Sequence, residues 1–127
     1  MEIRIPSARE ERKGQAHTVY QIVISYRDWS NRVEKRYSDC LELHRVMKLR
    51  RRALNKPLPR FPGKQVWKHL FGGLSTADID QRRQALEVYL NALVRSECAL
   101  TSPFLPEFFG MPPFVREMWM LEAVSSS

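Results

Sequence analysis

The hydrophobic period of the chain changes once, near residue 38, and this change constrains the fold more than any other feature of the sequence. Before it, apolar residues alternate with polar ones, which is the period of a half-buried strand. After it, apolar residues recur at spacings of three and four, which is typical of amphipathic helices. Strands followed by helices predict an α+β domain, with a three-stranded antiparallel sheet packed against a helical subdomain of three to four helices.

Three strands are predicted, at residues 1–6, 17–29 and 32–37. The second is the clearest, because it is rich in β-branched and aromatic residues. Its buried face is expected to carry Tyr20, Ile22, Ile24 and Tyr26. Residues 7–16 are polar and charged and are expected to form a loop, and residues 28–31 are expected to form a turn.

The first helix is predicted to follow Ser38, which would be its N-cap, with Asp39 in the first turn. Its buried stripe is expected to contain Cys40, Leu43, Met47 and Leu54. Three prolines then favour an extended path at residues 55–64 and end the helix.

A second long helix is predicted from Thr76 to about Arg95, opened by a capping box of Ser75 and Asp78. A short last helix is expected to have Ser102 as cap, Pro103 at its first position and Gly110 as its end. We expect residues 1–112 to form one domain. Residues 113–127 would be a C-terminal extension, either helical or the start of a linker.

The composition indicates an anionic partner without identifying it. Lys and Arg number 21 against 14 Asp and Glu, for a net charge of +7. Nucleic acid, an anionic membrane surface and an acidic protein all suit such a charge. The two cysteines, Cys40 and Cys98, lack metal-ligand spacing and are expected to be reduced core residues, so no metal or cofactor is predicted. The N-terminal residues do not resemble a secretory signal, and no apolar run approaches the roughly 20 residues of a membrane span.

Arg82 breaks the pattern of the second long helix, because it projects from the stripe between Ile79 and Leu86. A guanidinium there needs a counter-charge or a polar pocket, since an unpaired buried charge is costly. Either Arg82 pairs with an internal carboxylate such as Glu34 or Asp39, or it lines an anion site. The neighbouring Arg83 points about 100° away and is expected to be an ordinary solvated charge.

Arg36 raises a similar question at the end of the third strand. It precedes the N-terminus of a helix, where free backbone N–H groups and the helix dipole attract anions. The planar fork of arginine can grip a phosphate through two hydrogen bonds. Lys64, at the end of the proline-rich turn, would add a compact charge.

The order of these motifs, "KRYSD" at a helix start, "FPGK" closing a proline-rich turn and then "DQRRQALEVYL", resembles the PX (phox-homology) domain over residues 1–112. That family binds phosphoinositides on cytosolic membrane faces, as in sorting nexins and the fungal vacuolar SNARE that carries a PX domain. One departure is Cys40, where the family usually has a phenylalanine.

The resemblance assigns a role to each matching residue. Arg36 would hold the 3-phosphate, Tyr37 would stack on the inositol ring, and Ser38 would lie at the phosphate-facing helix start. Lys64 would meet the 1-phosphate, and Arg82 would hold the 4- and 5-hydroxyls. PX domains also insert apolar residues into the bilayer between the proline-rich turn and the next helix. The matching residues here are Val66, Trp67, Leu70 and Phe71. The alternative is that some of these side chains cover the domain's own core.

The resemblance therefore implies a non-enzymatic module that binds phosphatidylinositol 3-phosphate and recruits its parent protein for trafficking or fusion. It would be cytoplasmic, attached peripherally to endosomal or vacuolar membranes, and monomeric as an isolated domain, with SNARE or other trafficking proteins as partners. The alternative is a protein-interaction module, because "PLPRFP" contains a PxxP arrangement (Pro59 to Pro62) that could be a polyproline ligand. Nucleic-acid binding rests only on charge and on the "KLRRR" run at residues 48–52. No catalytic constellation accompanies the histidines.

Overall fold

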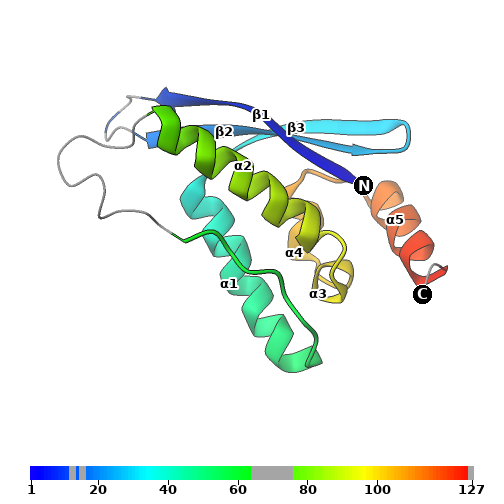
Figure 1. Cartoon of the computed structure of the whole chain (residues 1–127). Coiled ribbons are helices and arrows are strands. Elements are labelled where there is room, and N and C mark those ends of the chain that lie inside the picture. The colour runs from blue at the N-terminus through cyan, green and yellow to red at the C-terminus, as the bar shows by residue number, and fades with distance from the viewer. Residues whose placement is uncertain (12–13, 15–16, 64–75, 126–127) are drawn as a thin grey trace.

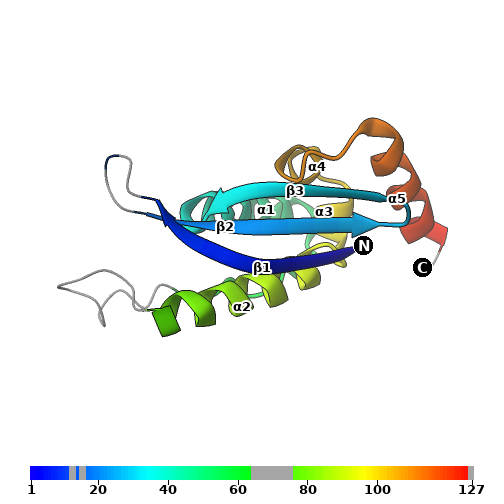
Figure 2. The same ribbon diagram turned by 90° about the horizontal axis from the view of Figure 1, so that it is seen from above.

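The computed structural model describes residues 1–11, 14, 17–63 and 76–125, and its described part has the predicted α+β architecture (Figure 1). Strands β1 (Glu2–Glu11), β2 (His17–Tyr26) and β3 (Trp29–Arg36) form an antiparallel sheet in that order. The helices lie against one face of the sheet, and α2 runs along β1 (Figures 1 and 2). Within the described residues the helices are α1 (Tyr37–Leu54), α2 (Thr76–Leu93), α3 (Glu97–Leu100), α4 (Phe104–Phe108) and α5 (Pro113–Ser125).

The sheet is longer at one edge than the sequence predicted. The expectation of a loop from residue 7 is wrong for the first part of that range, because β1 continues to Glu11 after an irregularity in register between Arg4 and Ser7. These residues are charged and mostly exposed, which an edge strand tolerates because one of its sides faces water. The hairpin between β2 and β3 also turns earlier, since Tyr26 pairs directly with Trp29.

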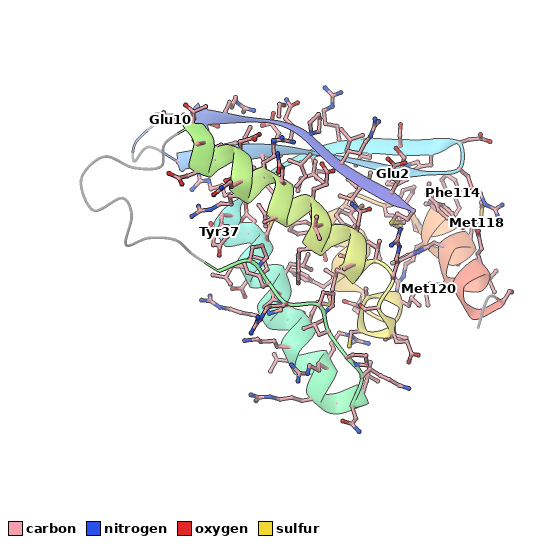
Figure 3. All side chains as sticks on the ribbon, in the orientation of Figure 1. Glu2, Glu10, Tyr37, Phe114, Met118 and Met120 are labelled. Carbon is pink, nitrogen blue, oxygen red and sulfur yellow. The ribbon has the colours of Figure 1, made fainter. Side chains whose placement is uncertain are left out.

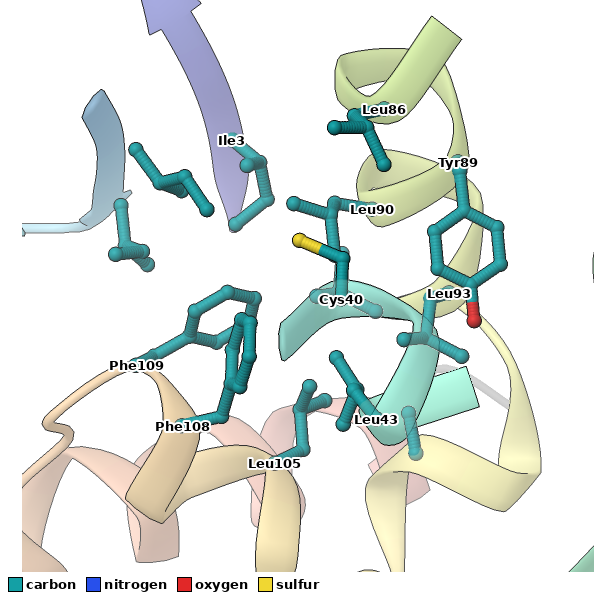
Figure 4. Packing of buried hydrophobic residues seen from close by; sticks show 14 of the residues in the cluster. Ile3, Cys40, Leu43, Leu86, Tyr89, Leu90, Leu93, Leu105, Phe108 and Phe109 are labelled. Atoms are coloured by element: carbon teal, nitrogen blue, oxygen red, sulfur yellow. The ribbon is translucent and has the colours of Figure 1, made fainter. Parts of the chain in front are cut away.

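The core forms where the inward face of β2 meets α1, α2 and α4. All four residues predicted for the buried face of β2 are buried, namely Tyr20, Ile22, Ile24 and Tyr26. Figure 4 shows Cys40 of α1 among apolar side chains from the other elements. Burial raises the pKa of the Cys40 thiol to about 12, so the thiol stays protonated at neutral pH. The prediction for Leu54 is wrong: it is 40% exposed, because α1 extends past the core at its C-terminal end.

The C-terminal part of the chain contains more helix than predicted. A four-residue helix, α3, precedes the expected short helix, and α4 begins at Phe104, whose N–H donates to the Ser102 hydroxyl at 3.1 Å. Gly110 ends this region at φ +64°, a conformation that glycine adopts without strain. A Cβ at Gly110 would lie 2.6 Å from the side-chain nitrogen of Asn31 on β3, so the close approach also requires glycine.

Residues 113–125 form α5, which packs at the β2–β3 end of the sheet. Val115 and Trp119 are buried in the core, and the Tyr26 hydroxyl donates a hydrogen bond to Glu122. Phe114 and Met118, which precede these two buried residues, are exposed on α5 (Figure 3). The segment is therefore a helix docked on the sheet.

Side chains of α2 hydrogen-bond to the backbone of β1 at the sheet edge. Asn91 accepts from the Ile3 N–H at 2.9 Å and donates to the Ile3 carbonyl at 2.7 Å. One turn earlier, Glu87 accepts from the Ile5 N–H at 2.7 Å. Arg83 donates to the Ile5 carbonyl at 2.6 Å and also bonds Asp80. The prediction that Arg83 is an ordinary solvated charge is therefore wrong. We call these three α2 residues the edge ladder, because together they satisfy four backbone groups that would otherwise be open to another strand.

An aromatic cluster holds the proline-rich segment against α1 and α2. Phe61 stacks on His44 at a centroid distance of 5.1 Å and meets the edge of Tyr89 at 4.9 Å. The Nδ1 atom of His44 hydrogen-bonds to the Tyr89 hydroxyl at 2.8 Å. Burial, and next the charge of Lys48, lower the pKa of His44. The segment thus has a structural role as a packed turn.

Replacing Asn91 should weaken the attachment of α2 to the sheet. Asn91→Ala leaves the part-buried N–H and carbonyl of Ile3 without their side-chain partners, so we expect the free energy of unfolding to fall by about 2–3 kcal/mol. Urea denaturation would measure this. As a control, Val88→Ala on the same helix, where Val88 is 70% exposed, should change stability by less than about 0.5 kcal/mol. Equal, small effects of the two variants would contradict a stabilising edge ladder.

The lowered pKa of His44 predicts a loss of stability as the pH falls. Since the folded protein holds this imidazole below its ordinary pKa of 6.5, the unfolded chain takes up the proton more readily. The contribution is fully present above about pH 6.5 and is lost progressively as the pH drops toward the folded pKa.

Urea denaturation between pH 7.5 and 5.5 would test this, with His44→Gln expected to lose this part of the pH dependence. Lys48→Gln should weaken the dependence, because it removes the nearby positive charge. If His44→Gln kept the full dependence of the parent chain, another group would be responsible.

Candidate functional site

The junction between β3 and α1 places Arg36 at the N-terminus of a helix. Arg36 has extended backbone angles, and its N–H donates to the Asp39 carboxylate at 2.8 Å. The helix therefore begins at Tyr37, and the prediction of Ser38 as N-cap is wrong because Asp39 reaches back instead. Ser38 lies exposed in the first turn. The Arg36 side chain is also exposed and makes no ion pair with any residue that the structure describes.

Arg82 reaches this junction from α2. Its guanidinium carbon lies 4.3 Å from the centroid of the Tyr37 ring, a cation–π contact, and the residue is half-buried. Neither predicted carboxylate partner is used: Glu34 bonds Arg9 at 2.8 and 2.9 Å, and Asp39 bonds the backbone of Arg36. Over the described ranges, Arg82 has no carboxylate partner. Its charge is therefore available to a ligand.

Tyr37 connects these two arginines to the proline-rich segment. It is only 7% exposed, lies 5.3 Å from Phe61 between ring centroids, and donates a hydrogen bond from its hydroxyl to the Pro62 carbonyl at 2.6 Å. Burial raises the pKa of Tyr37 and the positive charge of Arg82 partly counters this, so the phenol is neutral at physiological pH. Arg82 occupies one face of the ring that the resemblance assigns to the inositol. Stacking on that face would require the guanidinium to move.

The structure thus brings Arg36, Tyr37, Ser38 and Arg82 to one end of the molecule, where α1 begins. Lys64, the fifth predicted site residue, lies outside the described residues. So do the four residues predicted to enter the bilayer, namely Val66, Trp67, Leu70 and Phe71. The last described residues before them are Pro62 and Gly63. They lie beside Tyr37, because the Tyr37 hydroxyl hydrogen-bonds to the Pro62 carbonyl.

Tyr20 is a residue at this site that the sequence did not single out. It lies on the inward face of β2 with 0% exposure, and its hydroxyl has no hydrogen-bond partner in the described part of the chain. Burial raises the pKa of Tyr20, and the nearby charge of Arg82 is the largest opposing influence. Alternation correctly placed Tyr20 inward but gave no sign that its hydroxyl faces an arginine.

The basic run at the C-terminal end of α1 is a separate feature. Arg50 is not solvated there: it donates to the Thr101 carbonyl at 2.8 Å and ties α1 to the α3 region. Lys48, Arg51 and Arg52 instead line an open groove of about 570 Å³. Along α1, at about 1.5 Å per residue, these groove residues lie roughly 18–24 Å from Arg36. Since these distances exceed the Debye length of about 8 Å at physiological ionic strength, the direct effect of the groove charges on the arginine pair is largely screened.

The described ranges contain no group of three or more histidine, cysteine or acidic side chains placed to hold a metal ion. None of their helices combines the length and apolarity needed to cross a bilayer.

The likeness of this chain to known proteins agrees with the geometry. Residues 26–112 match the family model described as "PX domain". The chain is 33% identical over 107 residues to sorting nexin-24 of Homo sapiens, which covers 83% of this chain and 57% of that protein. It is 35% identical over 121 residues to sorting nexin-20 of Bos taurus, covering 84% of this chain and 36% of that protein. The chain thus spans little more than half of the one relative and about a third of the other.

A solved structure supports the same assignment. The X-ray structure of a designed CISK-PX domain superposes with a TM-score of 0.70 at 25% sequence identity, covering 86% of this chain and 98% of that one. The overall fold is therefore shared with that domain, and the chain belongs to the PX domain family.

Proposed function

We propose that this chain is a phosphoinositide-binding membrane-targeting module whose preferred ligand is phosphatidylinositol 3-phosphate. The observation that carries the proposal is the convergence of Arg36 and Arg82 on Tyr37, with neither guanidinium paired to a carboxylate of the described residues. Membership of the PX family supports the class of ligand.

The chemistry of the junction suits a phosphorylated polyol. The first turn of α1 presents backbone N–H groups and the positive end of the helix dipole. Arg36 adds a two-pronged donor for one phosphate. Arg82 approaches from the side with donors that suit ring hydroxyls, as expected for a site that reads a 3-phosphate and leaves the 4- and 5-positions unphosphorylated. Lys64 is proposed to meet the 1-phosphate that links the headgroup to the lipid.

Membrane attachment would combine this recognition with less specific forces. Val66, Trp67, Leu70 and Phe71 are proposed to enter the interface, where the amphipathic ring of tryptophan is favoured. The net charge of +7 adds attraction to anionic lipid. Because two weak signals act on one surface, their effects multiply. The proposed location is the cytosolic face of endosomal or vacuolar membranes, where the module would recruit a trafficking protein.

The polyproline alternative is not favoured by the packing. Pro59 and Pro62 are half-buried, and Phe61 between them is part of the aromatic cluster. A ligand for an SH3-type domain needs both prolines exposed on an extended helix. We therefore treat the segment as a support for the site.

Arg36→Ala should abolish selective binding to phosphatidylinositol 3-phosphate. Loss of a bidentate, charge-assisted contact is expected to raise the dissociation constant about 30- to 100-fold. Co-sedimentation with liposomes, each containing one phosphoinositide in a phosphatidylcholine background, would measure both affinity and selectivity. Arg32→Ala, an exposed arginine on the same strand, is the matched control and should change binding by less than threefold, on the order expected for one screened charge. Binding that is equally weak to every phosphoinositide in the parent chain would refute the ligand assignment.

Trp67→Ala should separate membrane insertion from headgroup recognition. We expect about 30-fold weaker liposome binding, since roughly 2 kcal/mol of interfacial burial is lost, and unchanged affinity for a soluble short-chain phosphatidylinositol 3-phosphate. Isothermal titration calorimetry and liposome co-sedimentation would be compared on the same preparations. Parallel loss in both assays would instead place Trp67 in the fold or in the headgroup site.

A further inference from the structure

The tyrosines of this chain differ in whether their hydroxyl groups are hydrogen-bonded. The chain has 4 tyrosines. Tyr26 donates to Glu122, Tyr37 donates to Pro62, and Tyr89 bonds His44. The hydroxyl of Tyr20 has no such partner among the described residues, although Tyr20 is fully buried. Buried hydroxyls are nearly always hydrogen-bonded, so this exception needs a physical explanation.

The position of Tyr20 supplies one. Among the fully buried residues on the inward face of β2 it lies nearest the site end of the sheet, and its hydroxyl lies within electrostatic reach of Arg82, Tyr37 and Cys40. Arg82 is therefore bordered by two phenols: the ring of Tyr37 lies 4.3 Å from its guanidinium carbon, and the hydroxyl of Tyr20 lies close enough for a weak side-chain interaction but does not meet the geometry of a hydrogen bond. A small shift of the guanidinium would bring the two groups into a hydrogen bond.

A neutral hydrogen-bond partner suits the Arg82 guanidinium better than a charged one at this site. A carboxylate would fix the direction of the guanidinium but would also compensate its charge and compete with an anionic ligand. A phenol hydroxyl accepts one of the five guanidinium N–H groups and leaves the charge in place. It can therefore orient Arg82 without weakening its attraction for an anionic headgroup.

We infer that Tyr20 is a positioning residue of the headgroup site, whose buried hydroxyl accepts a hydrogen bond from Arg82 when a phosphorylated inositol engages that arginine. This inference rests on the proposed function. In the free protein no described residue forms a well-aligned hydrogen bond with this hydroxyl, and in the complex Arg82 would form one. Tyr20 thus favours the bound position of Arg82 without touching the ligand.

The test is Tyr20→Phe, which removes the hydroxyl and keeps the ring. Titration calorimetry with dibutanoyl phosphatidylinositol 3-phosphate should show about a tenfold rise in the dissociation constant, as for loss of one hydrogen bond to a charged group. Thermal unfolding should show an unchanged or higher midpoint, because the substitution removes a buried polar group that no described residue engages in a well-aligned hydrogen bond. A merely structural role would give the reverse pattern.

Tyr26→Phe is the matched control, on the same strand and the same face but six residues, or roughly 20 Å, from Tyr20. Because its hydroxyl is bonded to Glu122, we expect a lower unfolding midpoint and an unchanged dissociation constant. A double-mutant cycle adds a second criterion: in an Arg82→Met background, Tyr20→Phe should have no further effect on headgroup affinity, measured by NMR titration.

The outcomes separate the inference from the function on which it rests. If the parent chain binds none of the soluble phosphoinositide headgroups, the proposed function fails. If the parent binds and Tyr20→Phe binds equally well, only the inference fails. A Tyr20→Phe chain that unfolds, or an effect that persists without Arg82, would also overturn it, because the hydroxyl would then have a partner other than Arg82.

Discussion

The edge ladder between α2 and β1 is the contact on which the arrangement of the site depends. A helix packed on a sheet by apolar side chains alone can rotate about its axis at modest cost, because dispersion contacts have little directionality. Hydrogen bonds from Arg83, Glu87 and Asn91 to fixed backbone atoms of β1 are directional and determine that rotation. Arg82, which immediately precedes Arg83 on the helix, is consequently directed toward Tyr37 and the start of α1.

In the described part of the chain, no carboxylate neutralises the positive charges of the two site arginines. The two acidic residues of this junction are already bonded, Glu34 to Arg9 and Asp39 to a backbone N–H. The arginines that converge there are instead bordered by neutral groups: an aromatic ring, a phenol hydroxyl and a helix N-terminus. Such surroundings orient a positive charge while leaving its field available, which distinguishes a ligand site from a structural ion pair.

Much of this arrangement could be predicted from the sequence, because it rests on periodicity. Alternation identified the buried face of β2, and helical spacing placed Arg82 on the inward side of α2. The predictions that were wrong have a common cause: each concerned a residue whose partner is distant in the sequence. Arg83 lies outside the apolar stripe of its helix, which predicts exposure to solvent. Its backbone partner, the Ile5 carbonyl, becomes evident only when β1 is placed beside the helix.

The same limit applies within the site and at its border. Ser38 is a good N-cap by residue type, but the N-cap is Arg36, two residues earlier, and Asp39 at the third helical position accepts a hydrogen bond from the Arg36 N–H. Tyr20 is indistinguishable by pattern from the isoleucines that follow it, since a pattern does not show where a hydroxyl points. The assignments of Lys64, Trp67 and their neighbours remain predictions from the family resemblance.

The geometry of the edge ladder also limits how much of a strand one helix can protect. Four helical residues advance about 6.0 Å, whereas two strand residues advance about 6.6–6.8 Å. Each further helical turn therefore adds more than about half an ångström of offset between the helix side chain and its strand residue, and the hydrogen bonds soon exceed their distance tolerance. The bonds serve Ile3 and Ile5, and the register of β1 is irregular between Arg4 and Ser7, a stretch that includes Ile5. From there to Glu11 the strand relies on a different safeguard, a row of charged side chains that would repel an approaching edge.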